Sequence, residues 1–488
     1  MILVLSAFTC ATLVTAHAPA QASDQLAVPQ VQVIEPKQVA GSVQYLVEKF
    51  SVDQREALRR LELQSILPSL AEELQERFPT EYAGAWLDQE NGGVAKIATT
   101  DTTRVDRVLS AIRARFKVET VQARWSLKQL AEAAERAEGV LGAKDPSGLR
   151  YLVDVDEVAN RVNVFERGAS DAISRAATAS ALPAGLPPDQ VVVRPLAMPG
   201  RSLSPDTGPS NSLLAPPSCN IGNYAAGALL CDKRSAKKMA GGKRLDVLRD
   251  NGSYGGCTNG FNISSTISPR NGWYYTLTAG HCILGANHAN QDFTWHGSTA
   301  VGYEHDHLVP PSGNLAFDVY PTDYAIMGYS GSQVHTWLIP YPTERNRVLH
   351  TSTNPQGWWY EVPVNGLRTY SSAAVGTVVC ATGSGTSSAN FPNTVDSGAG
   401  AGYYPGTRCG QITAKNGGFV TNICSRRGDS GGPLFTQGAT AVAYGLLSDG
   451  TNASGPCGSN EQSWYSPISR IFDRVNSIPG NYGYRIVT

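Results

Sequence analysis

In residues 24–182, segments whose apolar residues recur every three to four positions, as in helices, are followed by segments in which apolar and polar residues alternate, as in strands. Leu58 begins an apolar helical stripe, and Ser51 with Gln54 forms a capping box ahead of it. Pro68 is expected to divide this helix from a second one, because proline removes a helical hydrogen bond. Shorter alternating runs follow. The first part of the chain is therefore predicted to be a small α/β body.

Several short alternating runs in this part predict strands, and two longer stretches predict helices. A hairpin is expected where Asn91-Gly92 separates two of the runs, since this dipeptide suits a tight turn. The expected strands are residues 83–87, 94–98, 118–125, 151–155 and 161–165, with helices at residues 104–115 and after Ser126. No catalytic motif is evident in this body, and its charged residues are expected on solvated helix faces.

Residues 183–218 differ from both neighbours because they are rich in proline, serine and glycine. Such a stretch cannot bury a core, so it is predicted to be an exposed linker that proteases cut. From residue 219 onward, short β-rich runs alternate with turn residues. This pattern predicts an all-β part that ends in one amphipathic helix at residues 467–477.

The composition narrows the classes of function. The chain has 488 residues and a formal net charge of −1, so no strong field indicates nucleic acid or a membrane surface as the partner. Residues 1–23 combine an apolar run with small residues after it, which is typical of a secretory signal peptide. The run departs from that type in having no lysine or arginine before it. We expect an exported, extracellular protein.

Cysteine usage agrees with export. Cys10 lies in the expected signal peptide, and the other eight cysteines all follow residue 218. An even set in one part of an exported chain is typical of disulfides. No Cys-x-x-Cys spacing occurs, so a zinc site is not expected. The eight are Cys219, Cys231, Cys257, Cys282, Cys380, Cys409, Cys424 and Cys457.

The strongest chemical signal is the sequence Gly-Asp-Ser-Gly-Gly-Pro at residues 428–433. Glycines leave room for a substrate backbone and adopt the positive φ angles of a tight loop. Ser430 is the expected nucleophile, since a serine hydroxyl attacks a carbonyl once a neighbouring base takes its proton. Negative charge then develops on the carbonyl oxygen and needs donors already in place. The backbone N–H groups of Gly428 and Ser430 are the expected donors.

His281 is the expected base. It follows a β-rich run and precedes Cys282, which can pair with Cys257. That bond closes a loop of about 25 residues, stabilises by roughly 3 kcal/mol and fixes the backbone beside the base.

A neutral histidine needs a carboxylate that holds its tautomer. Asp323 is preferred because it opens an apolar run that orients and shields it, and Asp318 and Asp306 are the alternatives. Asp429 is not expected in this role. It is expected to pair with an N-terminal amine or an internal polar group and so to shape the serine loop.

The chain resembles the chymotrypsin family of serine proteases. The resemblance rests on Thr-Ala-Gly-His-Cys around His281, Gly-Asp-Ser-Gly-Gly-Pro around Ser430, and Asp323 between them. It is closest to the secreted bacterial branch, the α-lytic protease and streptogrisin group. Cys424 and residues 444–450 are similar to that group's serine loop and substrate-binding strand. Two further stretches, residues 82–89 and 151–155, are similar to its pro-regions.

The resemblance implies a fold and a division of the chain. The mature part is expected to form two six-stranded antiparallel β-barrels, with the catalytic residues between them and a C-terminal helix. The expected segments are a signal peptide at residues 1–23, a pro-region at 24–182, a linker with the processing site at 183–218 and the protease domain at 219–488. The pro-region is expected to assist folding, inhibit the enzyme and then be removed.

The resemblance also implies disulfide pairings and a substrate pocket. Cys424 is expected to pair with Cys457 and Cys380 with Cys409, which leaves Cys219 for Cys231. In that group, the strand here formed by Ser448, Asp449 and Gly450 lines the first substrate pocket. Asp449 favours a basic substrate side chain on one interpretation and faces solvent on the other. Leu447 stands where glutamate-cleaving members carry a histidine, which disfavours that preference.

We therefore predict a secreted serine endopeptidase, made as an inactive pre-pro-enzyme and acting on polypeptides as a monomer without cofactor or metal. An insertion at residues 288–340 has no assigned role. A metal site formed by His288, His296, His305 and His307 is a weaker alternative than exposed polar positions. Two other classes of function remain: a protease-like binding protein without turnover, and an ester-directed hydrolase.

Overall fold

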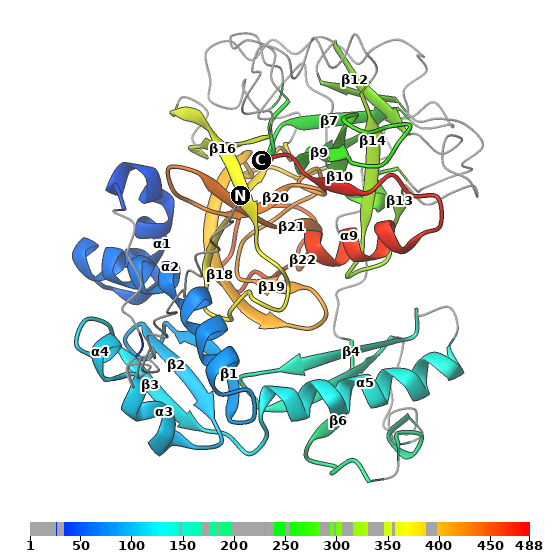
Figure 1. The fold of residues 1–488 in the computed structure, drawn as a ribbon. Helices are drawn as coiled ribbons and strands as arrows, with labels where there is room; N and C mark the ends of the chain where they lie inside the picture. The colour runs from blue at the N-terminus through cyan, green and yellow to red at the C-terminus, as the bar shows by residue number, and fades with distance from the viewer. Residues whose placement is uncertain are drawn as a thin grey trace, which may run out of the picture.

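The computed structural model has an N-terminal part and a C-terminal part that lie side by side (Figure 1). The described residues are 26, 34–145, 149–167, 176, 178–183, 185–196, 230, 239–248, 254–283, 293–296, 299–304, 316–329, 346–353, 357–386 and 398–488. The expected signal peptide, Cys219, Cys231 and most of the insertion at residues 288–340 lie outside these ranges. Within these ranges, the structure contains no helix that is long and apolar enough to cross a membrane.

The N-terminal part contains two three-stranded sheets and the helices that cover them, which confirms the α/β prediction. The sheets have the strand orders β1-β2-β3 and β4-β5-β6. The elements are η1 (Pro36–Val39), α1 (Ala40–Phe50), α2 (Gln54–Arg77), β1 (Tyr82–Asp88), β2 (Val94–Thr99), α3 (Thr102–Val108), α4 (Ser110–Arg113), β3 (Val118–Gln122), α5 (Leu127–Lys144), β4 (Tyr151–Asp156), β5 (Arg161–Glu166) and β6 (Val191–Pro195).

Two predictions about the first helices are wrong. Asp53, not Ser51, caps α2, and its carboxylate accepts a 2.7 Å hydrogen bond from Glu56 N. Helix α2 also continues through Pro68 instead of dividing there. Proline inside a helix costs about 3 kcal/mol. The leucines before and after it, among them Leu67 and Leu70, are buried in the core, and each contributes roughly 1.5–3 kcal/mol, so packing outweighs the cost.

The folded N-terminal part extends into the stretch expected to be a linker. Strand β6 pairs in parallel with β5, from Val162 opposite Val191 to Glu166 opposite Pro195. Val191 is buried in the same core as α5. Three consecutive valines favour a strand strongly enough to override the prolines around them.

The second half of the C-terminal part closes into a six-stranded antiparallel barrel, β21-β20-β17-β18-β19-β22, because β22 pairs back with β21. Strands β15 and β16 extend this sheet. The elements are β15 (Arg347–Thr351), β16 (Trp359–Leu367), β17 (Val378–Gly383), β18 (Gly406–Lys415), β19 (Phe419–Thr421), β20 (Pro433–Thr436), β21 (Ala441–Gly450), β22 (Ser463–Pro467) and α9 (Ile468–Ser477). The predicted C-terminal helix is confirmed as α9, which buries its apolar face.

The first half of the C-terminal part is a nine-stranded sheet in the order β23-β9-β10-β14-β12-β11-β7-β8, with β13 on β14. Its elements are β7 (Arg244–Leu248), β8 (Tyr254–Thr258), β9 (Phe261–Ser265), β10 (Tyr274–Thr278), η2 (Gly280–Cys282), β11 (Phe293–His296), β12 (Thr299–Glu304), β13 (Ala316–Phe317), β14 (Tyr324–Gly328) and β23 (Tyr484–Ile486).

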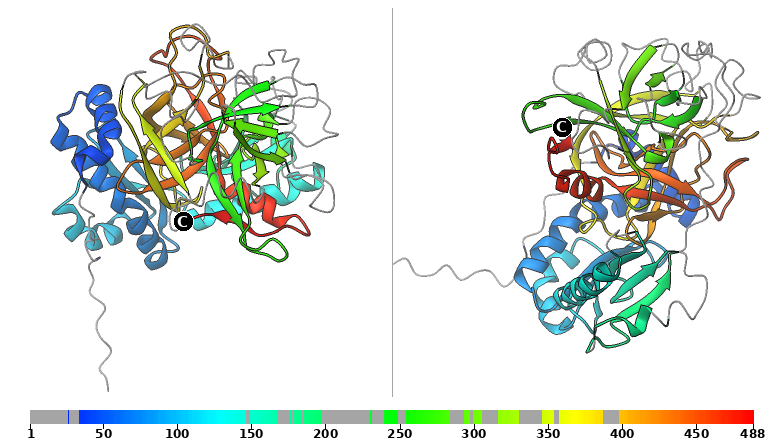
Figure 2. Two further views of the ribbon diagram at one scale, coloured as in Figure 1. Left: turned by 90° about the horizontal axis from the view of Figure 1, so that it is seen from above. Right: turned by 90° about the vertical axis from the view of Figure 1, so that its right-hand side faces the viewer.

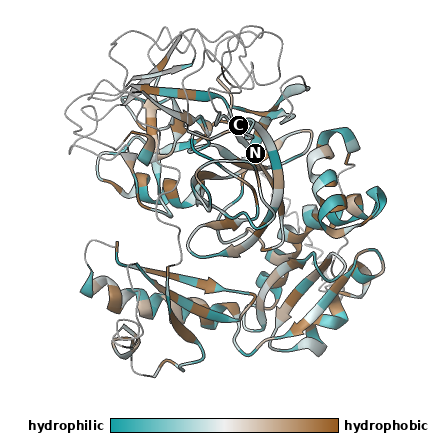
Figure 3. Ribbon diagram, turned by 180° about the vertical axis from the view of Figure 1, so that it is seen from behind, coloured by the Kyte–Doolittle hydropathy of each residue, from teal (hydrophilic) through white to brown (hydrophobic). Residues whose placement is uncertain are grey.

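One apolar core joins the two halves of the C-terminal part. It contains Phe261 and Leu277 from the first sheet, Phe435 and Leu446 from the barrel, and Phe472 from α9. Brown apolar residues are seen along strands and helices of both parts (Figure 3). Figure 2 shows the N-terminal part, in blue to cyan, against the barrel half in yellow to orange.

Candidate active site

Ser430 lies in a tight loop between β19 and β20. Gly428 has φ +90° and Gly431 has φ +80°, a backbone region that side chains disfavour. A Cβ at Gly431 would stand 2.0 Å from Thr278 Oγ1, so the loop approaches β10 only because this position is glycine. Thr258 then holds the loop from β8: its Oγ1 donates to Gly428 O at 2.7 Å, and its N–H donates to Ser430 O at 2.8 Å.

The structure brings His281, Asp323 and Ser430 together, although they come from separate segments. His281 Nδ1–H donates to Asp323 Oδ2 at 2.7 Å. Because a carboxylate only accepts, this proton fixes the tautomer, and Nε2 is left to accept from Ser430 Oγ–H at 2.8 Å. The exposed fractions of His281, Asp323 and Ser430 are 7 %, 1 % and 0 %, so these hydrogen bonds are shielded from water.

Asp323 is held by four hydrogen bonds at the start of β14. Its carboxylate accepts from His281 Nδ1, from His281 N at 3.1 Å and from Ser448 Oγ at 2.7 Å, and its own N–H donates to Ser466 Oγ at 3.0 Å. Burial by itself raises the pKa of this carboxyl. The charge of His281 and the bonds from His281 and Ser448 outweigh it, so the pKa of Asp323 lies below its usual value.

The geometry favours Asp323 over Asp318. Asp318 lies between β13 and β14 and is half-buried, whereas Asp323 is directly bonded to the histidine. Asp306 lies outside the described residues. An acidic residue at the first position of a buried strand is oriented by the sheet. This position in an apolar run is the reason why the sequence favoured Asp323.

The side chains of the expected substrate-binding residues on β21 point in directions that the sequence did not predict. The hydroxyl of Ser448 faces Asp323 and supports the carboxylate. Asp449 is 2 % exposed, and its Oδ1 accepts from Gly450 N at 2.8 Å, so the interpretation that it faces solvent is wrong. A bulge between Leu447 and Asp449 in the pairing with β22 re-aims these side chains.

Asp429 is buried beside the nucleophile and is satisfied by internal groups. Its carboxylate accepts from Gly385 N at 2.7 Å, from Arg426 N at 2.9 Å and from the Tyr403 hydroxyl. Arg408 donates to that hydroxyl at 2.9 Å and lies 4.3 Å over the Tyr403 ring. Burial raises the pKa of Asp429, opposed by the charge of Arg408 and these bonds. The serine loop is therefore shaped by an internal polar group, one of the two expected possibilities.

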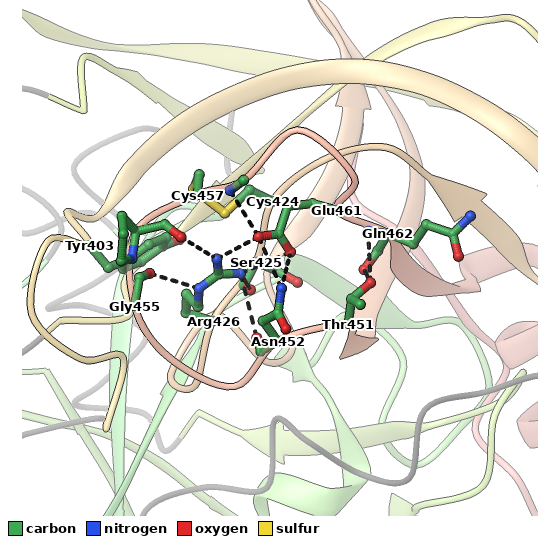
Figure 4. Close-up of polar contacts among 12 residues, drawn as sticks. Tyr403, Cys424, Ser425, Arg426, Thr451, Asn452, Gly455, Cys457, Glu461 and Gln462 are labelled. Carbon is green, nitrogen blue, oxygen red and sulfur yellow. Dashed lines mark hydrogen bonds and ion pairs between the residues drawn. A yellow bond between two sulfur atoms is a disulfide. The ribbon is translucent and has the colours of Figure 1, made fainter.

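A buried ion pair behind the serine loop was missed from the sequence. Arg426 and Glu461 meet at 2.6 Å, with exposed side-chain fractions of 1 % and 4 % (Figure 4). The guanidinium also donates to Gly455 O and Pro456 O at 2.8 Å each, and Asn452 Nδ2 donates to the same carboxylate at 3.1 Å. These bonds fix the connection between β21 and β22 against the serine loop.

Among the described residues, three disulfides lie close to these elements. Cys257 is joined to Cys282, which directly follows His281. The other two bonds join Cys380 to Cys409 and Cys424 to Cys457, which are the pairings that the resemblance implied. The Cys257–Cys282 bond ties the histidine segment to β8, and Cys424–Cys457 ties the serine loop to the connection after β21.

The weaker metal hypothesis gains no support among the described residues. No group of three or more possible ligands occurs there. His296 Nδ1 lies 2.9 Å from Arg244 O inside the first sheet, so this histidine has a structural contact. His288, His305 and His307 lie outside the described residues.

Comparison with known proteins gives one family match and several matches to solved structures. Residues 55–111 match the family described as Alpha-lytic protease pro N-terminal, which confirms the predicted resemblance to this group in the N-terminal part. Similar structures are Nocardiopsis protease (20 % identity, TM-score 0.30) and Thermobifida fusca protease A (22 %, 0.29). A third is a glutamic-acid-specific serine protease described as using a histidine triad in substrate binding (20 %, 0.32). Each match covers 51 % of this chain and 100 % of the other.

Proposed function

We propose that this chain is the precursor of a secreted serine endopeptidase that hydrolyses peptide bonds through an acyl-enzyme. The supporting observation is the continuous chain of hydrogen bonds from Ser430 Oγ through His281 to Asp323, at 2.8 and 2.7 Å. Its order of donors suits a serine whose proton moves to the imidazole as the oxygen attacks. The match of residues 55–111 to a protease pro-domain supports the same assignment.

In the first half of the reaction, Ser430 Oγ attacks the substrate carbonyl carbon while His281 Nε2 takes the hydroxyl proton. Asp323 keeps the imidazole oriented and stabilises the imidazolium that forms. The N–H groups of Gly428 and Ser430 donate to the oxyanion, which develops when the carbonyl π-bond breaks. His281 then gives its proton to the leaving amine. Water attacks the acyl-enzyme in the same way, with His281 as base, and releases the acid and the free serine.

The proposed architecture is a pair of barrels with this site between them. In the first sheet β8 is the last strand at one end, and β9 lies at the other end with the short strand β23 on its outer edge; only Asn259 and Gly260 separate β8 from β9 in the chain. A sheet whose two ends are consecutive pieces of chain is wrapped around on itself. If β8 and β9 are counted as one bent strand, the first barrel has six strands, the same number as the second barrel. The other five are β7, β10, β11, β12 and β14.

We further propose that the enzyme is made inactive and activated by cleavage between the two parts. The pairing of β6 with β5 supports a pro-region that continues to Pro195, and the sheet that contains β7 supports a mature domain after the cleavage site. Removal of a signal peptide near residue 23 and export to an oxidising compartment agree with the disulfides. The mature form is proposed to act as a monomer on polypeptides.

The test is to express the full chain in an exporting host and to treat the secreted protein with a fluorophosphonate probe. Mass spectrometry is expected to find the label on Ser430, in a fragment that begins between residues 200 and 242. His281→Ala is expected to abolish labelling, whereas His296→Asn leaves the label in place if that variant folds. Folded, disulfide-bonded protein that takes no label would overturn the proposal and favour the binding-protein alternative. Turnover of esters without peptides would favour the ester-directed hydrolase.

A further inference from the structure

A carboxylate of the N-terminal part is buried in the surface of the C-terminal part. Asp154, in β4, is 7 % exposed. Its Oδ2 accepts from the Tyr370 hydroxyl and from Gly417 N at 3.1 Å, and its Oδ1 accepts from Arg470 Nη2 at 3.3 Å. All three of these donors belong to the C-terminal part: Tyr370 follows β16, Gly417 lies between β18 and β19, and Arg470 lies on α9.

These donors are positioned by the C-terminal part itself. The Tyr370 ring packs on Phe419 at 5.4 Å, and Tyr370 N donates to Ser469 Oγ at 2.9 Å. Two cations flank the ring: Arg470 lies 4.0 Å from its centroid and Lys415 lies 4.7 Å from it. Tyr370 and Arg470 are therefore held in position by contacts within the C-terminal part.

Gly417 lets β4 approach. It has φ +89°, and a Cβ there would stand 2.0 Å from Leu152 Cδ2 of β4. With no side chain at this position, the backbone N–H reaches the Asp154 carboxylate directly. The fit between β4 and the turn after β18 is thus specific in shape as well as in charge.

The interface around this contact has complementary charge and lies next to a cavity. A second ion pair, Lys415 to Glu157 at 3.4 Å, lies beside it. Next to both is a cavity of about 800 Å³, lined by helices α2 and α5, by β4 and by residues 367–374. A cavity contributes no packing energy, so the polar contacts at its edge carry more of the attachment of β4. Helices α1 and α2 make separate contacts with the barrel, for example Gln64 with Val378.

We propose that Tyr370, Gly417 and Arg470 form a carboxylate-binding site of the catalytic part, with Asp154 as its ligand, and that this site retains the N-terminal part after the linker is cut. The inference rests on the proposed function, because it needs a cleaved chain. The ligand class is a single aspartate side chain presented on an extended strand. Removing one partner of a buried, hydrogen-bonded charge pair acts mainly on dissociation, so the loss of the Asp154 charge speeds release.

The experiment uses the full chain, secreted and allowed to process itself. The cleaved complex is isolated, and release of the N-terminal fragment is followed by size exclusion and by the rate of fluorophosphonate labelling. Asp154→Asn is expected to speed release by roughly 30-fold or more. The matched control is Asp156→Asn, two residues along β4. Among the described residues, its carboxylate accepts hydrogen bonds from Ala159 N and Asn163 Nδ2, both within the N-terminal part.

A change on the other side of the contact makes the test independent of the fold of the N-terminal part. Arg470→Gln is expected to speed release in the same direction, whereas Arg485→Gln, an exposed arginine on β23, is expected to leave it unchanged. If Asp154→Asn is not secreted, Tyr370→Phe serves in its place, since it removes only the hydroxyl. Release from the Asp154→Asn or Tyr370→Phe complex at the rate of the Asp156→Asn control overturns the inference. A wild-type chain that is neither cut nor labelled overturns the proposed function instead.

Discussion

Ser448 Oγ donates a 2.7 Å hydrogen bond to Asp323 Oδ2, the same oxygen that accepts from His281 Nδ1. The strand expected to line the substrate pocket thus also supports the carboxylate that orients the base. In the enzyme that we propose, Ser448 would couple substrate binding to the orientation of the base.

Replacing Ser448 with alanine tests this coupling. The bond to Ser448 is one of the contacts that lower the pKa of Asp323, so its loss raises that pKa. A charge-assisted hydrogen bond is worth about 1.5–3 kcal/mol, and kcat/KM is expected to fall on the order of ten- to a hundredfold. The acidic limb of the pH profile is expected to move to higher pH. Ser477→Ala, at an exposed end of α9, serves as the control, and coincident profiles of the two variants would contradict the coupling.

Asp323→Asn is expected to retain the fold and lose turnover. The amide presents a donor to His281, which favours the tautomer with its proton on Nε2, so the ring cannot accept from Ser430. A fall in kcat of about 10⁴-fold is expected at neutral pH. The comparison variant is Asp318→Asn, which tests the rejected alternative. Loss of activity in Asp318→Asn with retention in Asp323→Asn would reverse the assignment.

Breaking the buried pair of Arg426 and Glu461 is expected to destabilise the C-terminal part. Removing one partner leaves an uncompensated buried charge, which costs about 3–5 kcal/mol. Glu461→Gln and Arg426→Met are each expected to unfold faster in guanidinium chloride. The double variant Arg426→Met with Glu461→Leu is expected to recover part of that loss, because neither charge is then left unpaired. A double variant as unstable as the sum of the two single variants would refute this explanation.

His350 is expected to make stability fall in acid. Burial lowers its pKa from 6.5 to about 4, so the unfolded chain binds a proton more readily than the folded chain between these values. The contribution of neutral, buried His350 to the free energy of unfolding is fully present above pH 6.5 and is lost as the pH falls towards 4. It amounts to about 3 kcal/mol. Tyr360 and Phe435 stack on the ring at 5.1 and 5.0 Å, so His350→Phe preserves the packing. The wild-type and variant unfolding energies are compared from pH 7 to 4, and parallel curves would contradict the assignment.

The chemistry that we propose was predicted from short motifs in the sequence. Gly-Asp-Ser-Gly-Gly-Pro around Ser430 and the cysteine beside His281 need particular residue types at fixed spacing, and both segments lie where the sequence indicated. The amphipathic helix α9 was also readable, because its apolar period is local. The pro-domain resemblance was confirmed by a match over residues 55–111.

Contacts between residues that are distant in the chain could not be predicted from the sequence. Ser448 and Asp323 are 125 positions apart, and only the packing of the two sheets brings the hydroxyl to the carboxylate. The same holds for Arg426 with Glu461 and for Asp429 with Tyr403, whose side chains meet in a buried space that several loops create together. Pro68 and strand β6 were misjudged for a related reason, since tertiary burial outweighed local propensity.

The sequence by itself determined which residues carry the proposed chemistry, because reactive groups need specific side chains in a specific local order. The tertiary structure decided how each of them is oriented and charged, because orientation and pKa depend on neighbours that folding brings from elsewhere. It also decided that Asp154 of one part is bound by Tyr370, Gly417 and Arg470 of the other. No local pattern specifies such a contact, since its free energy arises only when the two surfaces meet.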